Sequence, residues 1–308
     1  MKIAVIGAGA MGCLYGAYLS QHHQVIMIDT LKEQVEAINQ GGIVVTEANG
    51  EQRTFSGVSA YVSGECEQAV DAVIVFVKST YTQVALEQNR ALFKPTTLVM
   101  TLQNGAGNDR LIEQYVDKNN IIIGTSKHNA VNLTRGQIKH PASGVTTIGS
   151  NFNAEQQIQT AAKLLEQAGF AIDVTDDIQR IIWSKLLVNL SVNTFTAITQ
   201  TPIGYMLKNQ HAWDFAKRLI YEAIEVAEAD GTYFDRREAL EMVKSVCETA
   251  GGGYSSMYQD RKNHVKMEID AINGAIVEQA KRYGVPTPYN TLIVDLIHAI
   301  EGAYDIYG

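Results

Sequence analysis

The sequence predicts an α/β protein in which a doubly wound parallel sheet forms the N-terminal domain and an all-helical domain follows it. Two patterns lead to this prediction. Short, uniformly apolar runs alternate with helical stretches up to about residue 175, whereas from about Asp177 helical periodicity prevails and β-rich runs almost disappear. Apolar strands that alternate with helices are typical of a parallel sheet covered on both faces. We therefore expect one domain over residues 1–175 and a second over residues 176–308.

Each expected element follows from its own pattern. The strands of the first domain are uninterrupted apolar runs, expected at 3–6, 25–28, 72–77, 97–101 and 121–124, with smaller strands at 42–45 and 145–148. Helices over 11–20 and 31–39 separate the first strands. In the second domain, apolar residues at helical spacing predict helices over 178–196, 211–230, 236–249, 267–283 and 289–302.

The composition narrows the range of partners and compartments. A net charge of −8 argues against nucleic acid as a partner. Because no run reaches about 18 consecutive apolar residues, we expect no membrane span. The cysteines Cys13, Cys66 and Cys247 form neither a disulfide pattern nor a metal-binding one, so the sequence predicts a cytoplasmic protein without a metal site. The oligomeric state stays open, a homodimer included.

A glycine-rich loop follows the first expected strand and opens the first helix. Gly7, Gly9 and Gly12 have the GxGxxG spacing. The first glycine permits a tight turn, the second lets the backbone approach a pyrophosphate, and the third lets helix and strand pack closely. The backbone N–H groups at Ala10 and Met11 would then face the phosphates at the positive end of the helix. This context predicts a Rossmann-type dinucleotide site, although a strand–helix turn without a ligand would look the same.

The second expected strand ends at Asp29, about 20 residues after the loop begins. A carboxylate at this position accepts hydrogen bonds from ribose hydroxyls and repels a 2′-phosphate, which favours NAD over NADP as the cofactor. Two other interpretations stay open. Asp29 can simply cap the next helix, and Lys32, the nearest cation, can neutralise a 2′-phosphate.

Five segments occur in a characteristic order and spacing: GAGAMG at 7–12, VFVKS at 75–79, LQNGAGN at 102–108, WSKLLVNLSVN at 183–193 and SSMYQDRKNHVKMEIDAINGAIV at 255–277. By these segments the chain resembles the ketopantoate reductase family along nearly its whole length. The resemblance implies a Rossmann domain followed by a helical domain. It also implies an enzyme that reduces a small 2-oxo acid to the D-2-hydroxy acid with a nicotinamide cofactor.

The resemblance further implies roles for individual residues. Lys185 matches the family's catalytic lysine and Glu268 its essential glutamate. Residues that match the substrate cleft are Asn104, Asn189, Asn193 and Ser256. Residues that match the edge of the cofactor site are Lys78 and Asn104.

The residues themselves indicate a site at Lys185. Hydride transfer to a ketone builds negative charge on the carbonyl oxygen, so a proton donor such as a lysine ammonium must meet it. Lys185, Asn189 and Asn193 are spaced by four in an otherwise apolar helix and so line one face of it. Polar groups in such a helix are costly unless they have partners, which indicates a site. A solvated polar stripe is the alternative.

The other residues also have plain structural explanations. Glu268, expected in a helix, can belong to a solvated face. Ser255 and Ser256 precede a helix and can serve as its N-cap. Lys78 and Asn104 follow expected strands, where ligands of doubly wound sheets gather, but each can be an ordinary loop residue.

Two departures from the ketopantoate-specific pattern bear on the substrate. Ile203 stands at the position where those reductases have an asparagine that binds the hydroxyl of ketopantoate. Asp29 stands where those reductases, which use NADP, usually have a basic residue nearby. Both features resemble the NAD-dependent D-2-hydroxyacid dehydrogenase branch, of the D-mandelate dehydrogenase type, which implies a branched or aromatic 2-oxo acid. Ketopantoate reductase with NADPH remains the alternative. A nucleotide-binding sensor on an inactive reductase scaffold is a third hypothesis, against which the intact Lys185 and Glu268 argue.

Overall fold

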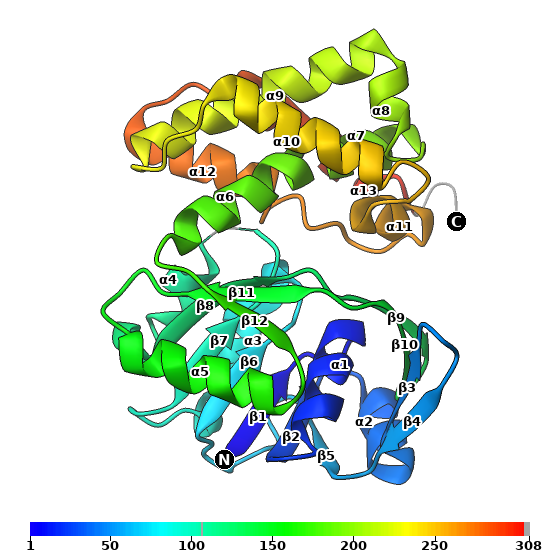
Figure 1. The fold of residues 1–308 in the computed structure, drawn as a ribbon, viewed down its shortest axis with the longest axis vertical. Helices are drawn as coiled ribbons and strands as arrows, with labels where there is room; N and C mark the ends of the chain where they lie inside the picture. The colour runs from blue at the N-terminus through cyan, green and yellow to red at the C-terminus, as the bar shows by residue number, and fades with distance from the viewer. Residues whose placement is uncertain (106, 305–308) are drawn as a thin grey trace. The chain divides into compact units, whose positions relative to one another are not determined.

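The computed structural model describes residues 1–105 and 107–304, which divide into two units by their internal contacts (Figure 1). Unit 1 comprises residues 1–103 and 107–178, and unit 2 comprises Asn104, Gly105 and residues 179–304. Every described strand lies in unit 1, and the described part of unit 2 is helical. The QNG segment is therefore divided. Gln103 belongs with the sheet, whereas Asn104, which falls in the first domain by the sequence boundary, packs with the helical unit.

The main sheet of unit 1 has, among the described residues, eight strands in the order β12-β11-β8-β7-β6-β1-β2-β5. Their bounds are β1 (Lys2–Ile6), β2 (Gln24–Asp29), β5 (Val58–Val62), β6 (Ala72–Val75), β7 (Leu98–Thr101), β8 (Ile121–Ser126), β11 (Val145–Gly149) and β12 (Ala171–Val174). Neighbouring strands are parallel except β8 and β11, which are antiparallel. The predicted α/β class with a parallel sheet is confirmed.

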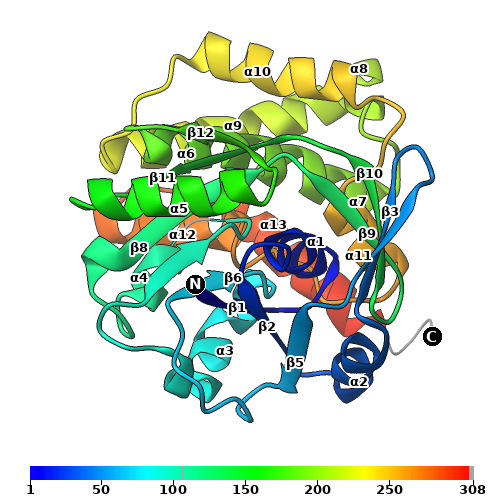
Figure 2. The ribbon, with the colours of Figure 1, turned by 60° about the horizontal axis from the view of Figure 1, so that its bottom comes forward.

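The helices of unit 1 cover both faces of this sheet (Figure 2). They are α1 (Ala10–Leu19), α2 (Lys32–Gly41), α3 (Thr82–Gln88), α4 (Asn108–Ile112) and α5 (Glu155–Gln167). From β1 the chain crosses through α1 to β2, whereas from β6 it crosses through α3 to β7 in the opposite direction. Because crossovers are right-handed, this reversal puts α1 and α3 on opposite faces. The reversal between β1 and β6 also creates a switch point at the carboxyl ends of these strands, where doubly wound sheets bind ligands.

A second sheet of unit 1 was largely missed at the level of sequence. It has the order β4-β3-β10-β9, with bounds β3 (Ile43–Glu47), β4 (Gln52–Phe55), β9 (Asn129–Thr134) and β10 (Gln137–Ala142). Only β3 was expected, as a smaller strand. Strand β9 is exposed along most of its length and β10 buries only every second residue at its start. Neither strand therefore has the uninterrupted apolar run by which the buried strands were identified.

Unit 2 is built from helices around one apolar core, which includes Trp183, Leu187, Leu219, Ile276 and Ile297. In chain order they are α6 (Ile178–Val188), the π-helix η4 (Asn189–Asn193), α7 (Thr194–Thr199), α8 (Tyr205–Lys208), α9 (Gln210–Ala229), α10 (Arg236–Thr249), α11 (Ser256–Lys262), α12 (Asn273–Tyr283) and α13 (Pro288–Gly302). The predicted all-helical character is confirmed. Within the described residues, the run over Ile178–Thr199 is long and apolar enough to cross a membrane, but 61% of its apolar window is buried inside the protein, as in an ordinary core helix.

Two expected elements are clearly shorter in the structure. The strand expected over 72–77 ends at Val75, because the chain turns there toward a short 3-10 helix at Ser79–Tyr81. The helix expected over 267–283 begins only at Asn273. Before it, the Ile269 carbonyl accepts from the N–H of Gly274, and the N–H of Met267 is bonded to a side chain, Glu301 Oε1 at 2.6 Å. These contacts replace the regular helical bonds over the first part of the expected helix.

Candidate active site

The three glycines of the loop have different surroundings. Gly7 has φ +101°, and a Cβ on it would lie 2.7 Å from the backbone nitrogen of Val77. A Cβ on Gly12 would lie 1.8 Å from the carbonyl oxygen of Gly7, so only glycine lets α1 approach the loop. A Cβ on Gly9 would meet nothing within 4 Å, and Gly9 lines a cavity of about 400 Å³. Folding thus explains Gly7 and Gly12, whereas Gly9 leaves the backbone open to the cavity, which fits a pyrophosphate.

The start of α1 has the character of an anion site. Gly9 is its N-cap, and among the described residues no side chain caps the helix and no acidic residue lies in its first turn. The first backbone N–H groups of a helix lack partners within it, and here these belong to Ala10, Met11 and Gly12. Together with the positive end of the helix dipole they suit a phosphate. The loop therefore has both the accessible backbone and the donors that a pyrophosphate needs.

Asp29 lines the same cavity and is hydrogen-bonded to the glycine-rich loop. Its Oδ2 accepts from the N–H of Ala8 at 2.8 Å, and its Oδ1 accepts from the N–H of Leu31 at 2.9 Å. Helix α2 begins only at Lys32 and has no side-chain cap from the described residues, so simple capping does not describe this carboxylate. Each carboxylate oxygen has further acceptor capacity, which leaves both able to accept from a ribose hydroxyl.

Among the lining residues of this cavity that the sequence did not predict, Gln34 and Arg135 bear on its chemistry. Gln34 donates from Nε2 to the carbonyl of Ala8 at 2.7 Å and accepts from the N–H of Gly136 at 3.1 Å, so it ties the loop to the β9–β10 hairpin. The hairpin brings the exposed Arg135 to the cavity that Asp29 lines. No local signal could identify Arg135, because only the pairing of a distant hairpin places it there.

Lys78 lies at the carboxyl edge of the sheet, beside the switch point. The N–H of Phe76 donates to the carbonyl of Ile6 at 2.8 Å, which extends the contact between the ends of β1 and β6. Gln103, which follows the neighbouring strand β7, contacts the segment after β6. Its Nε2 donates to the carbonyl of Val77 at 2.6 Å and to Thr82 Oγ1 at 2.8 Å. Lys78 is half-buried and follows this braced segment directly.

The three polar residues of the long helix in unit 2 flank a π-turn. Lys185 lies in the last turn of α6, and Asn189 and Asn193 are the first and last residues of η4. Sequence reasoning expected an uninterrupted α-helix. Hydroxyls bond back to carbonyls throughout this run, with Ser191 Oγ 2.7 Å from the Leu187 oxygen. Such bonds compete with the helical ladder and bend helices, and π-turns occur frequently at functional sites.

Lys185 and Glu268 interact electrostatically in unit 2. Burial lowers the pKa of Lys185 to about 8, and the negative charge of Glu268 opposes this shift. Among the described residues, no hydrogen bond or ion pair of the Lys185 ammonium is present, so its donors stay available to a ligand. Asn104 completes the group, since its Nδ2 donates to Glu268 Oε2 at 3.3 Å. The structure thus brings together three of the predicted residues.

The position of Glu268 corrects the expectation that it lies in a helix. It precedes α12 in a segment of turns, where its carbonyl accepts from the N–H groups of Ala271 and Ile272 at 3.2 and 3.1 Å. Gly105 packs against this segment with φ +88°, and a Cβ on it would lie 2.2 Å from the carbonyl oxygen of Ala271. The glycine after Asn104 is therefore required for the close approach that brings Asn104 to Glu268.

The two serines before α11 have separate positions. Ser255 is the buried N-cap, accepting at Oγ from the N–H of Tyr258 at 3.0 Å and contacting Thr196 Oγ1 at 2.7 Å. Ser256 is the first residue of the helix and is exposed. Capping therefore explains Ser255 and leaves the hydroxyl of Ser256 accessible.

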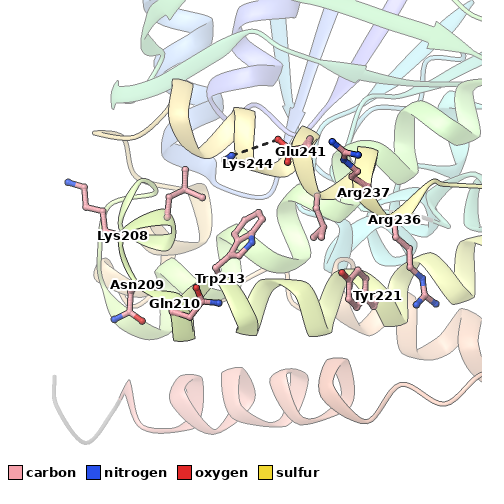
Figure 3. A pocket seen from close by; sticks show the side chains of 11 residues that line it. Lys208, Asn209, Gln210, Trp213, Tyr221, Arg236, Arg237, Glu241 and Lys244 are labelled. Carbon is pink, nitrogen blue, oxygen red and sulfur yellow. Dashed lines mark ion pairs between the residues drawn. The ribbon is translucent and has the colours of Figure 1, made fainter.

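A larger cavity of unit 2 lies apart from these residues (Figure 3). It has a volume of about 660 Å³ and lies between the start of α9 and α10, with Trp213, Tyr221 and Arg237 on its walls. Lys244 and Glu241 form an ion pair there at 3.8 Å. None of the predicted site residues lines this cavity, so size alone does not mark the site in unit 2.

Comparison with known families agrees with this arrangement in both units. The family described as Ketopantoate reductase PanE/ApbA matches residues 3–152, and its C-terminal counterpart, Ketopantoate reductase PanE/ApbA C terminal, matches residues 177–301. The chain belongs to the ketopantoate reductase family. It is accordingly an oxidoreductase that acts on 2-oxo acids with a nicotinamide cofactor, NAD or NADP.

Relatives within the ketopantoate reductase family have two kinds of name. The 2-dehydropantoate 2-reductase of Lactococcus lactis is 31% identical over 98% of each chain, and that of Streptococcus pyogenes serotype M1 is 29% identical over 99% of this chain and 100% of its own. A solved structure of D-mandelate dehydrogenase with NADH and anilino(oxo)acetate is 33% identical, covers 99% of this chain and 100% of its own, and has a TM-score of 0.92. The family is therefore settled, and the relatives differ in the substrate that they are named for.

Proposed function

We propose that this enzyme reduces a 2-oxo acid with a branched or aromatic tail to the D-2-hydroxy acid, with NADH as the reductant and Lys185 as the general acid. The observation that carries the proposal is the group formed by Lys185, Glu268 and Asn104, with a lysine pKa lowered to about 8. The balanced reaction consumes a 2-oxo acid, NADH and a proton and yields the 2-hydroxy acid and NAD⁺. We expect the enzyme to work in the cytoplasm.

Lys185 supplies the proton. When bound, the nicotinamide supplies the hydride that adds to the carbonyl carbon. The Lys185 ammonium donates its proton to the carbonyl oxygen as negative charge develops there, and solvent then restores the proton to the amine. A donor with a pKa of about 8 is still protonated at neutral pH and is a stronger acid than an ordinary lysine. Glu268 keeps the ammonium charged, and Asn104 holds the carboxylate in place.

The other predicted residues take binding roles in this proposal. Gly7, Gly9, Ala10, Met11 and Gly12 hold the pyrophosphate, Asp29 accepts from the ribose hydroxyls, and Lys78 lies at the nicotinamide edge. The accessible hydroxyl of Ser256 and the amides of Asn189 and Asn193 serve the substrate.

Two features support NADH and an apolar tail. Asp29 repels a 2′-phosphate, and Ile203 offers no hydrogen bond to a substrate hydroxyl. The main chain of Ile203 is held by a hydrogen bond from its N–H to the Gly253 carbonyl at 3.0 Å, and its half-buried side chain packs on the core of unit 2. The D-mandelate dehydrogenase relative, whose structure contains NADH, adds support for this choice.

The second candidate is reduction of ketopantoate with NADPH. The curated relatives at 28–31% identity are named 2-dehydropantoate 2-reductase, and Arg135 gives the cofactor cavity a cation that can bind a 2′-phosphate. The sensor hypothesis has no comparable support, because family membership and the intact group around Lys185 both favour catalysis.

One experiment separates these candidates. The purified protein is assayed for NADH and NADPH oxidation with phenylglyoxylate, 2-oxoisovalerate and ketopantoate, and kcat/KM is compared over the six combinations. The proposal expects the highest values with NADH and one of the first two acids. Highest kcat/KM with ketopantoate and NADPH would establish the second candidate, and no turnover with any pair would favour the sensor.

A further inference from the structure

The π-turn η4 is fixed by a contact from outside its own helical run. The carbonyl oxygen of Leu190 accepts from Thr194 Oγ1 at 2.6 Å and from Asn273 Nδ2 at 3.1 Å. Thr194 begins α7, which continues the run, whereas Asn273 is the first residue of α12. A carbonyl oxygen can accept more than one hydrogen bond, so both side-chain donors can bond to it. A side chain of another helix therefore secures the turn.

Asn273 is itself held by a chain of buried polar groups. Its Nδ2 also donates to Asn290 Oδ1 at 3.0 Å, and Asn290 Nδ2 donates to Glu222 Oε2 at 2.8 Å. The Glu222 carboxylate further accepts from the backbone N–H groups of Tyr289 and Asn290 at 2.8 and 2.9 Å. Asn273 and Asn290 are 0% exposed and Glu222 is 7% exposed. The chain thus runs from α9 through the start of α13 and the start of α12 to η4.

Packing alone does not account for asparagine at position 273. Its Oδ1 is buried and has no hydrogen-bond partner among the described residues. Buried polar atoms without partners are unfavourable and uncommon in proteins. An apolar side chain of similar size would fill the space without that penalty. What only the asparagine supplies is the N–H donor that reaches both Asn290 and the Leu190 carbonyl.

We propose that Asn273 is a positioning residue, which keeps η4 in its π-helical geometry and so fixes the direction of the Lys185 side chain relative to that of Asn193. This inference rests on the proposed role of Lys185 as the proton donor. Lys185 precedes η4 and Asn193 ends it, so relaxation of the π-turn to α-helical geometry rotates these two residues relative to each other. Glu222 and Asn290 act one step further away, by holding Asn273.

The test compares Asn273→Ala with a matched control in unit 1. Asn89 is 1% exposed, and its Nδ2 donates to the Ala85 carbonyl and to Ser63 Oγ, both at 2.8 Å, so Asn89→Ala removes a comparable buried amide. Asn273→Ser retains a shorter donor and serves as the conservative variant, which also carries the comparison if Asn273→Ala does not fold. The measurements are Tm, kcat and KM for the 2-oxo acid at saturating NADH, and the pH dependence of kcat.

Asn273→Ala and Asn89→Ala should differ in their effect on catalysis but not in their effect on stability. Both alanine variants should lower Tm, but only Asn273→Ala should lower kcat, by roughly tenfold to a hundredfold, the range expected when a catalytic group is misplaced by about 1 Å. Its KM should change less. The basic limb of the pH dependence of kcat should move to higher pH, because a less tightly held Lys185 is better hydrated and its pKa therefore rises. Asn273→Ser should recover part of both effects.

The contrary result is a loss of Tm in the Asn273 variants with kcat and its basic limb equal to those of the unmodified enzyme, which would make Asn273 purely structural. Lys185→Ala, assayed in parallel, tests the premise separately. If it retains near-normal turnover, the proposed proton donor is wrong. If it loses turnover while the Asn273 variants keep theirs, the positioning role alone is wrong.

Discussion

Asn104 donates a hydrogen bond to Glu268, which lies 164 residues further along the chain, at 3.3 Å. Because Gly105 allows the backbone to approach Ala271, the amide reaches the carboxylate whose charge partly opposes the lowering of the Lys185 pKa by burial. An asparagine from the loop after β7 therefore belongs by its contacts to the helical unit. This relationship joins two separate segments of the chain into one group of polar side chains.

The first prediction concerns Lys185. Lys185→Ala should lower kcat by roughly 10²–10⁴, the usual contribution of a positioned general acid. The Kd of NADH should change little, because the glycine loop belongs to unit 1. Steady-state kinetics and a fluorescence titration with NADH check the two parts. Lys208→Ala, which changes an exposed lysine of the same unit, is the control. Turnover close to normal in Lys185→Ala would remove it from the mechanism.

The second prediction concerns pH. The proton donor is active in its charged form, so the rate of reduction should be constant at lower pH and fall as the pH rises through about 8. The reverse reaction needs the neutral amine and should rise over the same range. Glu268→Gln removes the charge that raises the pKa of Lys185, so the basic limb should move to lower pH. A basic limb that stays in place in this variant would show that Glu268 does not set the proton affinity of Lys185.

The third prediction uses two glycines of one loop. Gly12→Ala should lower Tm strongly, because its Cβ would lie 1.8 Å from the Gly7 carbonyl oxygen. Gly9→Ala should leave Tm nearly unchanged, since its Cβ meets nothing and its φ of −71° suits alanine, but it should weaken NADH binding because the methyl group enters the cofactor cavity. Calorimetry and an NADH titration measure the two effects. Unaltered NADH affinity in Gly9→Ala would place the pyrophosphate elsewhere.

The fourth prediction concerns the choice between cofactors. NADH should bind more tightly than NADPH, and Asp29→Asn should narrow this difference because the repelling charge is lost. Arg135→Ala should weaken the binding of NADPH more than that of NADH, since Arg135 brings a positive charge to the cavity that Asp29 lines. The measurement is the Kd of both cofactors for the three proteins. The assignment of NAD is wrong if the unmodified protein binds NADPH more tightly.

The fifth prediction concerns the tail of the substrate. An apolar pocket discriminates weakly among tails, whereas a site built to bind a hydroxyl rejects analogues that lack it. Ile203→Asn should therefore shift the kcat/KM ratio toward ketopantoate by a modest factor, since one added hydrogen bond contributes about 0.5–1.5 kcal/mol. Ile203→Val, which stays apolar, should leave the ratio nearly unchanged. A hundredfold preference for ketopantoate in the unmodified enzyme would overturn the assigned substrate class.

Local sequence patterns were sufficient to predict the elements whose formation depends mainly on one local feature, such as an apolar run or helical spacing. Buried parallel strands such as β1 and β2 were identified from apolar runs, and α10 and α13 from helical spacing. The GxGxxG loop was recognisable because the geometry of a tight turn and of close helix packing restricts Gly7 and Gly12 to glycine. Lys185 was recognisable because it is a charged residue in an otherwise apolar helix.

Other features depend on contacts between distant segments, which no local pattern encodes. The turns that carry Glu268 replace an expected helix because Met267 bonds to Glu301 and because Gly105 packs on Ala271. The cavity at Asp29 includes Arg135 only because the β9–β10 hairpin pairs beside the loop.

The sequence by itself therefore determined the class of fold, the cofactor loop, the family and the identity of the proton donor to be tested. Tertiary structure alone decided that Asn104 reaches Glu268, that the helix of Lys185 opens into a π-turn, and that Asn273 bonds to the Leu190 carbonyl. The physical reason is that hydrophobic periodicity and glycine geometry act over a few residues. Hydrogen bonds between buried side chains, by contrast, form only after packing has brought remote segments within about 3 Å of each other.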